Sequence, residues 1–346
     1  MKKKGLNERQ LQRIQKIQDA KAARAARQQA KAETTTVSAA LGPPQRGLVI
    51  SHYGQQLEIE ALEGDLRGEV VRCFQRSNLE PLVTGDEVIW QAGDPLGVVV
   101  AQSPRRSVLK RPNLFNELKP VAANIDHVVI VIAPFPEPHA NLIDRYLVAT
   151  ELMGSQAILL LNKADLLDAQ THRPLLDLLA LYGSLGYPSL QVSSRQGSGI
   201  AALQEQLAGS NSVFVGQSGV GKSALVNALL PDCHSPEGAL SLAETKGRHT
   251  TTAARLFHFP QGGNLIDSPG IREFGLWHVE PAQLLQGFVE FRPFLSGCRF
   301  RDCRHDREPG CRLQAAVSEG RINAGRLASF QLILSTLAPG LPSRSP

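Results

Sequence analysis

The sequence predicts a multi-domain protein with an N-terminal OB-like β-barrel, a central α/β domain built on a parallel sheet, and a C-terminal α-helical domain. Three observations support this fold class. Short runs of alternating polarity follow Arg46, apolar strands alternate with helices from about residue 113 to 285, and cysteines gather near the C-terminus. A chain of 346 residues has room for two or three such domains.

The composition argues against a membrane-spanning or a disulfide-stapled protein. Hydrophobic residues make up 42% of the chain, yet no apolar run reaches the roughly 18 to 20 residues of a membrane span. The lysine-rich start has no apolar stretch behind it, so we expect no secretory signal. Five cysteines, three of them close together, favour a reducing cytoplasm and a metal site. We therefore expect a cytoplasmic protein with no membrane partner.

Residues 1–44 form a basic arm that we expect to be disordered or conditionally helical. Residues 1–32 hold ten lysines and arginines against two acidic residues, whereas the whole chain carries a net charge of only +5. The apolar stripe of the arm is too thin to fold on a core. The concentrated charge suggests a polyanionic partner, although a solvated tail without a partner would show the same pattern.

The barrel is expected over residues 45–112. Turn residues there separate five strand-like runs, RGLVISHYG, QQLEIEAL, LRGEVVRC, GDEVIWQ and LGVVVAQ. Five strands in so short a segment favour an OB-like barrel. Barrels of this kind often bind oligonucleotides, but the fold alone does not establish that activity.

The α/β domain is expected over residues 113–285. We expect strands at HVVIVIA, QAILLLN, SLQVSS and NSVFVG, and helices at NLIDRYLVATELMG and KSALVNALL. Near-continuous apolar strands that alternate with helices indicate a parallel sheet covered on both faces. Open parallel sheets bind ligands at the carboxyl ends of their strands, so the residues that follow these strands are the candidates for a site.

A phosphate-binding loop follows the strand NSVFVG. Its residues fit G-x-x-x-x-G-K-[ST] in full: Gly216, Gln217, Ser218, Gly219, Val220, Gly221, Lys222 and Ser223. The glycines let backbone N–H groups turn inward around phosphate oxygens, and the next helix adds its positive end. Lys222 is expected to reach the β- and γ-phosphates and to act in catalysis, and the Ser223 hydroxyl is expected to bind Mg²⁺.

A guanine-binding motif follows the strand QAILLLN. Asn162, Lys163 and Asp165 match N-K-x-D, and the Asp165 carboxylate can accept hydrogen bonds from guanine N1–H and the exocyclic amine. Adenine lacks this pair of donors, and a buried acceptor left unpaired is costly, so Asp165 favours GTP over ATP. Ser193 and Ser194, after another strand, could offer a backbone N–H to guanine O6.

A second phosphate motif, D-x-x-G, lies in LIDSPG. Asp267 would hold Mg²⁺ through water, and the Gly270 N–H would sense the γ-phosphate. Between the two phosphate motifs, three consecutive threonines each offer a hydroxyl that could complete the Mg²⁺ shell. We favour Thr251, and Thr250 and Thr252 remain alternatives.

These motifs stand in an unusual order along the chain. The guanine motif precedes the phosphate loop, whereas an ordinary GTPase has the phosphate loop first. Such a change of order is compatible with the fold, because the arrangement of strands in the sheet brings the site residues together whatever their order in the chain. In addition, the termini of compact domains often lie close together. The order therefore indicates a circularly permuted GTPase domain.

The C-terminal domain, expected over residues 286–338 before a tail at 339–346, carries a metal-site pattern. Cys298, Cys303, His305 and Cys311 form C-x4-C-x-H-x5-C. Three thiolates and one imidazole complete a tetrahedral shell for one Zn²⁺ per chain, and no position stays open for a catalytic water, so we expect a structural site. The alternative, reduced cysteines in a core, fits poorly with the charged neighbours, which include five arginines that suit RNA phosphate.

A β-barrel, a permuted GTPase domain and a cysteine–histidine knuckle, in this order, resemble the RsgA (YjeQ) family of small ribosomal subunit biogenesis GTPases. The resemblance covers roughly residues 45–335 and rests on LNKADLL, GQSGVGKSALVNAL, GRHTTTAARL, LIDSPGIREFGL and the cysteine–histidine cluster. It implies a bacterial cytoplasmic protein that binds the small ribosomal subunit and its rRNA late in assembly. It also implies slow GTP hydrolysis that the subunit accelerates.

One residue departs from a common GTPase pattern. Ile271 follows the D-x-x-G motif, where many GTPases place a glutamine that orients the attacking water. Hydrolysis should then be slow, or another group must position the water. His249, beside the three threonines, is a candidate catalytic residue, and an exposed polar loop residue is the equal alternative.

The sequence thus favours a monomeric GTP hydrolase that binds GTP and GDP and assists maturation of the small ribosomal subunit. One alternative is a non-catalytic RNA-binding module that uses GTP as a conformational signal, which the complete set of Lys222, Ser223 and Asp267 disfavours. Another is a membrane or signalling GTPase, which the absence of a lipidation motif disfavours.

Overall fold

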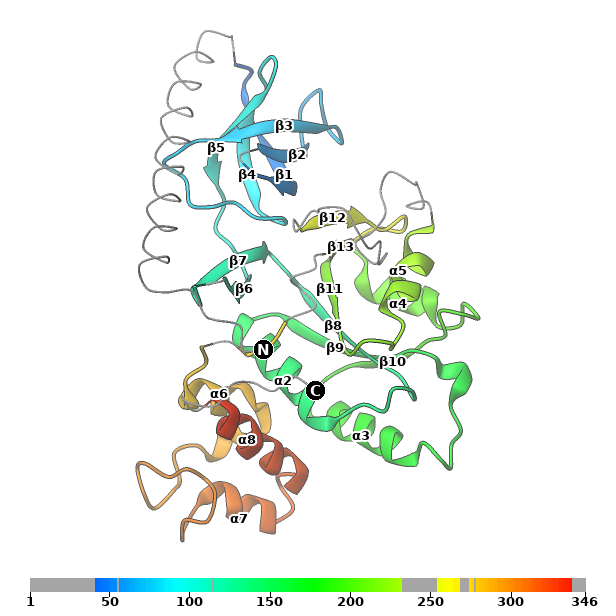
Figure 1. The fold of residues 1–346 in the computed structure, drawn as a ribbon, viewed down its shortest axis with the longest axis vertical. Coiled ribbons are helices and arrows are strands. Elements are labelled where there is room, and N and C mark those ends of the chain that lie inside the picture. Colours follow the sequence, from blue (N-terminus) through cyan, green and yellow to red (C-terminus); the bar gives the residue numbers. More distant parts are fainter. Residues whose placement is uncertain are drawn as a thin grey trace, which may run out of the picture. The chain divides into compact units, whose positions relative to one another are not determined.

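The structure is a computed structural model of the chain (Figure 1). It describes residues 41–54, 56–113, 115–231, 254–267, 274–276 and 278–337. These residues fall into two compact units, each of which is described by itself. The first comprises residues 41–82 and 87–104, and the second comprises residues 83–86 and the described residues from 105 onward. Most of the expected basic arm and the C-terminal tail lie outside the described residues.

The first unit is a closed barrel. Its strands are β1 (Pro44–Tyr53), β2 (Gln56–Ala61), β3 (Val70–Gln75), β4 (Glu87–Gln91) and β5 (Gly97–Gln102). β1, β2 and β3 pair in antiparallel succession, β3 pairs with β5 in parallel, and β4 joins β5 to β1 and so closes the ring (Figure 1). The ring confirms the predicted OB-like barrel.

The barrel core follows from the alternation of side chains along the strands. In β2, Leu57, Ile59 and Ala61 point inward and are buried, while the residues between them are half-buried. Trp90 of β4 is fully buried among them. Gly47 of β1 makes room for the indole, because a Cβ there would lie 2.4 Å from Ile59 and 2.6 Å from Trp90.

The second unit is built on a six-stranded sheet with the order β10-β9-β8-β11-β13-β12. The strands are β8 (His127–Ile132), β9 (Gln156–Leu161), β10 (Ser189–Gln191), β11 (Asn211–Val215), β12 (Arg255–His258) and β13 (Asn264–Asp267). All neighbours pair in parallel except β12, which is antiparallel to β13. The parallel sheet predicted from the apolar strands is confirmed.

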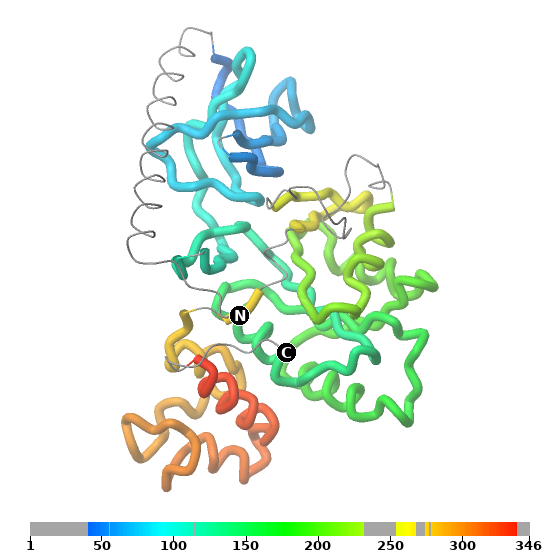
Figure 2. The backbone as a smooth tube through the Cα atoms, in the orientation of Figure 1, coloured from blue at the N-terminus to red at the C-terminus, as the bar shows by residue number. Residues whose placement is uncertain are grey.

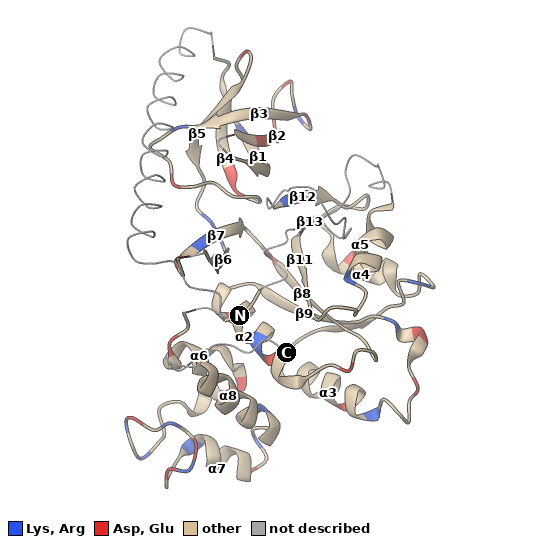
Figure 3. Ribbon diagram, viewed as in Figure 1, with Lys and Arg blue, Asp and Glu red and all other residues tan. Residues whose placement is uncertain are grey.

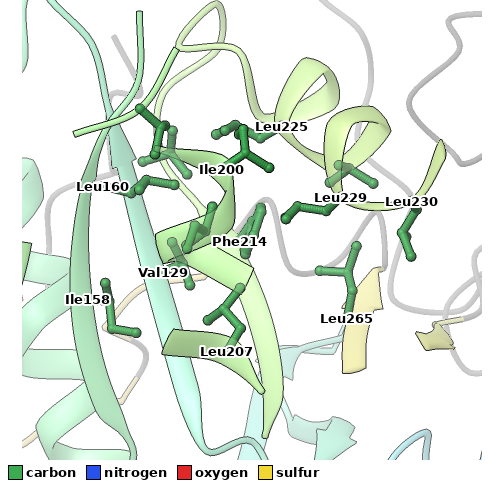
Figure 4. Close-up of a cluster of buried hydrophobic side chains, with 14 of the residues drawn as sticks. Val129, Ile158, Leu160, Ile200, Leu207, Phe214, Leu225, Leu229, Leu230 and Leu265 are labelled. Atoms are coloured by element: carbon green, nitrogen blue, oxygen red, sulfur yellow. The ribbon is translucent and has the colours of Figure 1, made fainter. Parts of the chain in front are cut away.

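Helices cover both faces of this sheet. They are α2 (Ala140–Met153), the short 3-10 helix η1 (Ala164–Leu166), α3 (Arg173–Ser184), α4 (Ile200–Leu207) and α5 (Lys222–Leu229). Val129 and Val131 of β8 pack in one buried cluster with side chains of α4 and α5 (Figure 4). The alternate residues Val128 and Ile130, also fully buried, point to the opposite face, and α2 contacts β8 and β9.

The direction of winding reverses between β8 and β11. From β8 the chain runs outward through β9 to β10, then returns to β11 and continues to β13 on the other side. Open α/β sheets bind ligands at such a reversal, outside the carboxyl ends of the strands. The topology therefore places a candidate site at the ends of β8 and β11.

Residues that follow the barrel begin the second unit with a hairpin of β6 (Val108–Pro112) and β7 (Leu118–Ala123). The segment Val83–Asp86, although it connects barrel strands in the sequence, belongs to this unit. Fully buried Asp86 forms a two-pronged ion pair with Arg105, with both N–O distances at 2.7 Å. The Thr84 hydroxyl donates to the carbonyl of Ala254 at 2.9 Å.

The C-terminal region contains α6 (Pro281–Gly287), η4 (Val289–Phe294), α7 (Arg312–Ser318) and α8 (Ala324–Leu337). At the centre of its core, the rings of Phe288 and Phe291 stack, and Phe330 meets both of them edge-on. Gly320, which takes a left-handed conformation after α7, separates α7 from α8. Among the described residues, none of the helices combines the length and the apolar character needed to span a membrane.

Candidate nucleotide-binding site

Two of the predicted motifs, the guanine motif and the phosphate loop, lie on loops at one edge of the sheet. Ile132 of β8 stands beside Leu161 of β9, and Leu161 stands beside Gln191 of β10, so these strands end at the same level. Val215 of β11 stands beside Ile130, two residues before the end of β8. Because the strands are parallel, the guanine motif and the phosphate loop are brought together although they are far apart in the chain.

Asn162 ties three of these loops together. Its side chain is completely buried directly after β9. The amide Nδ2 donates to the carbonyl of Val220 in the phosphate loop at 2.9 Å, and Oδ1 accepts from the backbone N–H of Ser194 at 3.2 Å. Asn162 therefore organises the site from within.

Lys163 connects a fourth loop to the three that Asn162 joins. Its backbone is left-handed, with φ of 58°. The ammonium donates to the carbonyl of Gly219 at 2.7 Å and to the carbonyl of Phe135, after β8, at 2.8 Å. The lysine thus holds the phosphate loop against the loop that follows β8.

The orientation of the Asp165 carboxylate is set by a neighbouring serine. The Ser193 hydroxyl, which is fully buried, donates to Asp165 Oδ1 at 2.5 Å. The same hydroxyl accepts from the backbone N–H of Gln196 at 3.1 Å. The half-buried carboxylate is held by one oxygen, which leaves its other oxygen to serve as an acceptor for a base.

The phosphate loop depends on glycine at two positions. Gly216 has φ of 139°, and a Cβ there would lie 2.2 Å from the carbonyl oxygen of Val131. Gly221 has φ of 93°, and its Cβ would lie 2.4 Å from Asn162 Nδ2. Since neither position has space for a side chain, both glycines are required for the shape of the loop.

The other residues of the loop lie where an anion could meet them. Lys222 begins α5, and its ammonium donates to the carbonyls of Gly216 and Gln217, both at 2.7 Å. Ser218 and Ser223 are exposed, whereas Val220 is buried and anchors the loop in the core. The positive end of α5 and the ammonium are therefore both directed at the loop.

Asp267 ends β13, the parallel neighbour of β11. Ser212 stands beside Leu265, so Asp267 lies beside the last residues of β11, next to the phosphate loop. Hydroxyl and carboxylate oxygens, as Ser223 and Asp267 offer, are ligands that Mg²⁺ takes in phosphate sites. Thr251, Gly270, Ile271 and His249 lie outside the described residues, so their roles remain predictions.

Tyr146 of α2 is part of the site although no sequence motif marks it. The tyrosine is buried, and the backbone of Gly216 lies close enough to its hydroxyl to affect its pKa. Burial raises the pKa of Tyr146 above its ordinary value, despite the opposing effect of the Gly216 backbone. Its ring stacks on Phe274, with centroids 6.0 Å apart. The sequence offers no signal for this role, since Tyr146 is one of several apolar residues on an amphipathic helix.

The four predicted metal ligands meet in the C-terminal region. Their ligand atoms all lie within 4.8 Å of one another. The sulfurs of Cys298 and Cys311 lie 3.6 and 3.4 Å from His305 Nδ1. A tetrahedral Zn²⁺ shell would put sulfur and nitrogen about 3.6 Å apart, so the cluster, completed by Cys303, could hold a metal ion.

Relatives of this chain extend over nearly its whole length. A family model described as RsgA GTPase matches residues 102–277. A protein from Azotobacter vinelandii, named small ribosomal subunit biogenesis GTPase RsgA, is 59% identical over 338 residues, which are 97% of this chain and 98% of the relative. The chain belongs to the RsgA GTPase family. A relative of the same name from Ectopseudomonas mendocina is 58% identical with the same coverage.

Two solved structures share the RsgA architecture. YjeQ from Thermotoga maritima superposes with a TM-score of 0.71 at 31% identity, and the match covers 86% of this chain and all of that chain. YloQ, described as a circularly permuted GTPase, superposes with a TM-score of 0.69 at 26% identity, covering 87% and 98% of the two chains. These matches confirm the permuted order that the motifs indicated.

The contacts of Asn162 lead to a prediction for this RsgA family member. Asn162→Ala is expected to weaken GTP and GDP binding by about tenfold to a hundredfold, because the carbonyl of Val220 and the N–H of Ser194 lose their buried partner. Titration with a fluorescent guanine nucleotide measures the effect. Asn227→Ala, at an exposed position on α5, is the matched control and should bind like the wild type.

Proposed function

We propose that this protein hydrolyses GTP and assists the late maturation of the small (30S) ribosomal subunit, which in turn stimulates the hydrolysis. The supporting observation is that loops from four strand ends, joined through Asn162 and Lys163, place a guanine motif beside a phosphate loop. The names of the relatives supply the ribosomal part of the proposal. We also propose that the protein is a monomer and works in the cytoplasm.

Guanine selection is assigned to the residues after β9 and β10. Asp165, oriented by Ser193, would accept from guanine N1–H and the exocyclic amine. Lys163 spans from the loop after β8 to the phosphate loop, so its alkyl chain borders the region between base and phosphates. The N–H of Ser194 is shared with Asn162 by a rather long bond, and a contact to guanine O6 would compete with that bond.

Hydrolysis would proceed by attack of water on the γ-phosphorus, which breaks the bond to the β-phosphate oxygen and releases GDP and phosphate. Lys222 stands at the start of α5 and would exchange its carbonyl partners for β- and γ-phosphate oxygens, where it stabilises the charge of the transition state. Ser223, Thr251 and Asp267 would hold Mg²⁺, which supplies further positive charge to the same oxygens. Gly270 would donate its N–H to the γ-phosphate.

The cysteine–histidine cluster is assigned to one structural Zn²⁺. Three thiolates and an imidazole use all four tetrahedral positions, so no site remains for a catalytic water. The loop between η4 and α7 that bears the ligands has little apolar content, and metal binding would supply its folding energy.

Contacts with rRNA are assigned to the basic segments and the barrel. Four arginines lie on the loop before α7, beside the metal cluster (Figure 3). The basic arm adds further positive charge. Phosphate contacts by such segments are electrostatic, so binding and stimulation should both weaken as salt is raised.

The deciding experiment measures GTP turnover with purified 30S and 50S subunits, alongside co-sedimentation in GTP, GDP and a non-hydrolysable analogue. We expect slow turnover alone, strong stimulation by 30S subunits only, and the tightest association in the GTP-like state. Subunit binding without any turnover would instead support a GTP-responsive RNA-binding module. Absence of both turnover and subunit binding would refute the proposal.

A related prediction concerns His249. Because Ile271 cannot orient water, the subunit is proposed to bring His249 to the attacking water. Stimulation of the wild type is expected to be about two to four orders of magnitude, and that of His249→Ala much smaller, while both bind nucleotide alike. His258→Ala, with an exposed histidine at the other end of β12, is the control. Full stimulation of His249→Ala would exclude His249 as the water-positioning group.

A further inference from the structure

Helix α2 lies between the nucleotide-binding site and the C-terminal helices. It contacts β8 and β9 on the sheet, and it also contacts α6 and α8 (Figure 2). Asp144 and Tyr146 are two residues apart, about 200° around the helix, so they point in nearly opposite directions. Both are buried.

Asp144 faces a buried ionic network. The guanidinium of Arg326, from α8, is 2% exposed and pairs with Asp144 and with Glu290 of η4. Two bonds join Arg326 to Glu290, at 2.6 and 3.1 Å. Tyr182 of α3 donates to Asp144 at 2.6 Å. Burial lowers the pKa of Arg326, but the hydrogen bond to Glu290 and the two carboxylate charges raise it above its ordinary value, so the arginine stays charged.

Further polar contacts join α2 to α8 on either side of this network. Asn141 donates to the Ser329 hydroxyl at 3.0 Å, and Arg145 donates to the Thr336 hydroxyl at 2.7 Å. Directional contacts of this kind fix the register of the two helices more tightly than apolar packing would. Movement of α2 along its axis would therefore displace α8.

The helix α8 in turn contacts the metal cluster. Gln331 donates to the backbone carbonyl of His305 at 2.8 Å, and the Phe330 ring meets the His305 ring edge-on. Both residues stand one turn beyond Arg326 on α8. The metal cluster therefore contacts α8, the helix whose Arg326 pairs with Asp144.

Tyr146 faces the nucleotide-binding site. Its hydroxyl lies near the backbone of Gly216, whose carbonyl accepts from Lys222. Its ring stacks on Phe274, which is four residues after Gly270 in the sequence. The tyrosine is thus in contact both with the first residue of the phosphate loop and with the chain just beyond the D-x-x-G motif.

We propose that α2 couples the nucleotide state to the C-terminal domain, with Tyr146 as the positioning residue on the nucleotide side and the Asp144–Arg326–Glu290 network on the other. The inference rests on the proposed GTP binding at this site. A shift of Gly216 or Phe274 between the GTP and GDP states moves Tyr146 and α2. The network transmits the shift to α8, because separating buried charges from their partners costs far more than moving the helices together.

Hydrogen–deuterium exchange of the metal-loaded full chain tests the proposal, with GDP and a β,γ-imido GTP analogue as the two bound nucleotides. In the wild type, exchange of α8 amides should differ by about fivefold or more between the two states. Tyr146→Leu removes both the hydroxyl and the ring that stacks on Phe274, and it should at least halve this difference while both nucleotides still bind. Asp144→Asn, which weakens the pair with Arg326 at constant shape, should do the same.

Asp177→Asn is the matched control, because Asp177 forms an exposed ion pair with Arg173 on α3, outside the network. It should retain the full difference. If Asp144→Asn lowers the stability of the C-terminal domain, Tyr146→Leu alone decides. The wild type could bind both nucleotides and be stimulated by 30S subunits, yet show the same α8 exchange in the GDP and GTP-analogue states. That result overturns the coupling and leaves the proposed function intact. Full retention of the difference in Tyr146→Leu also overturns it.

Discussion

Asp165→Asn is expected to change the nucleotide specificity from guanine to xanthine. The Ser193 hydroxyl holds Asp165 by one oxygen, so the asparagine should keep its carbonyl oxygen toward Ser193 and present its amide group to the base. That amide meets the N1–H and amine donors of guanine with another donor, and GTP affinity should fall by about a hundredfold or more. Xanthine has a carbonyl oxygen at C2 that accepts from the amide, so binding of xanthosine triphosphate should improve.

Competition between GTP, ATP and xanthosine triphosphate for a fluorescent GDP measures this change. Asp168→Asn is the matched control. Asp168 lies three residues after Asp165 in the same loop, is exposed, and accepts a hydrogen bond from the backbone N–H of Thr171. The control should keep its preference for GTP. If the wild type binds ATP as tightly as GTP, Asp165 does not select guanine over adenine.

Cys303→Ala is expected to remove the metal and unfold the loop that precedes α7. With one ligand gone, the bound zinc should fall from about one per chain to nearly none, since folding of a small metal site depends on the metal-binding energy. The α/β domain has its own core on both faces of the sheet, so the variant should still bind GTP. Metal analysis of the purified protein, with proteolysis of the C-terminal region, measures both effects.

The barrel cysteine provides the control for this experiment. Cys73 is fully buried among the barrel side chains, and burial raises the pKa of its thiol to about 12. A thiol that stays protonated at neutral pH does not bind zinc. Cys73→Ala should therefore keep about one zinc per chain. A wild type without zinc, whose cysteines all react as thiols, would exclude the metal site.

Much of the fold could be predicted because the deciding signals are local. Alternation in runs such as QQLEIEAL predicts half-buried strands, and continuous apolar runs such as HVVIVIA predict strands buried on both faces. The strand–loop–helix context of residues 216–223 predicts the phosphate loop, and the order of the motifs predicts the permutation. Each motif lies within one short segment, whose conformation depends mainly on that segment, and the permutation follows from the order of these segments along the chain.

The contacts that support the site could not be predicted in this way. No motif marks Tyr146 or the carbonyl of Phe135. Asp144 and its partner Arg326 are separated by 182 residues. Whether a buried charge finds its partner depends on how helices pack, and sequence periodicity shows only which face is apolar.

The sequence by itself determined the fold class, the permuted motif order, and the residues proposed to meet guanine, phosphate and metal. The tertiary structure alone decided that Asn162 is a buried connector of three loops and that Ser193 orients Asp165. It also decided that one helix touches both the phosphate loop and the C-terminal domain. The physical reason is that a motif specifies local backbone shape and chemistry, whereas hydrogen bonds between loops depend on the parallel register that brings strand ends to the same edge.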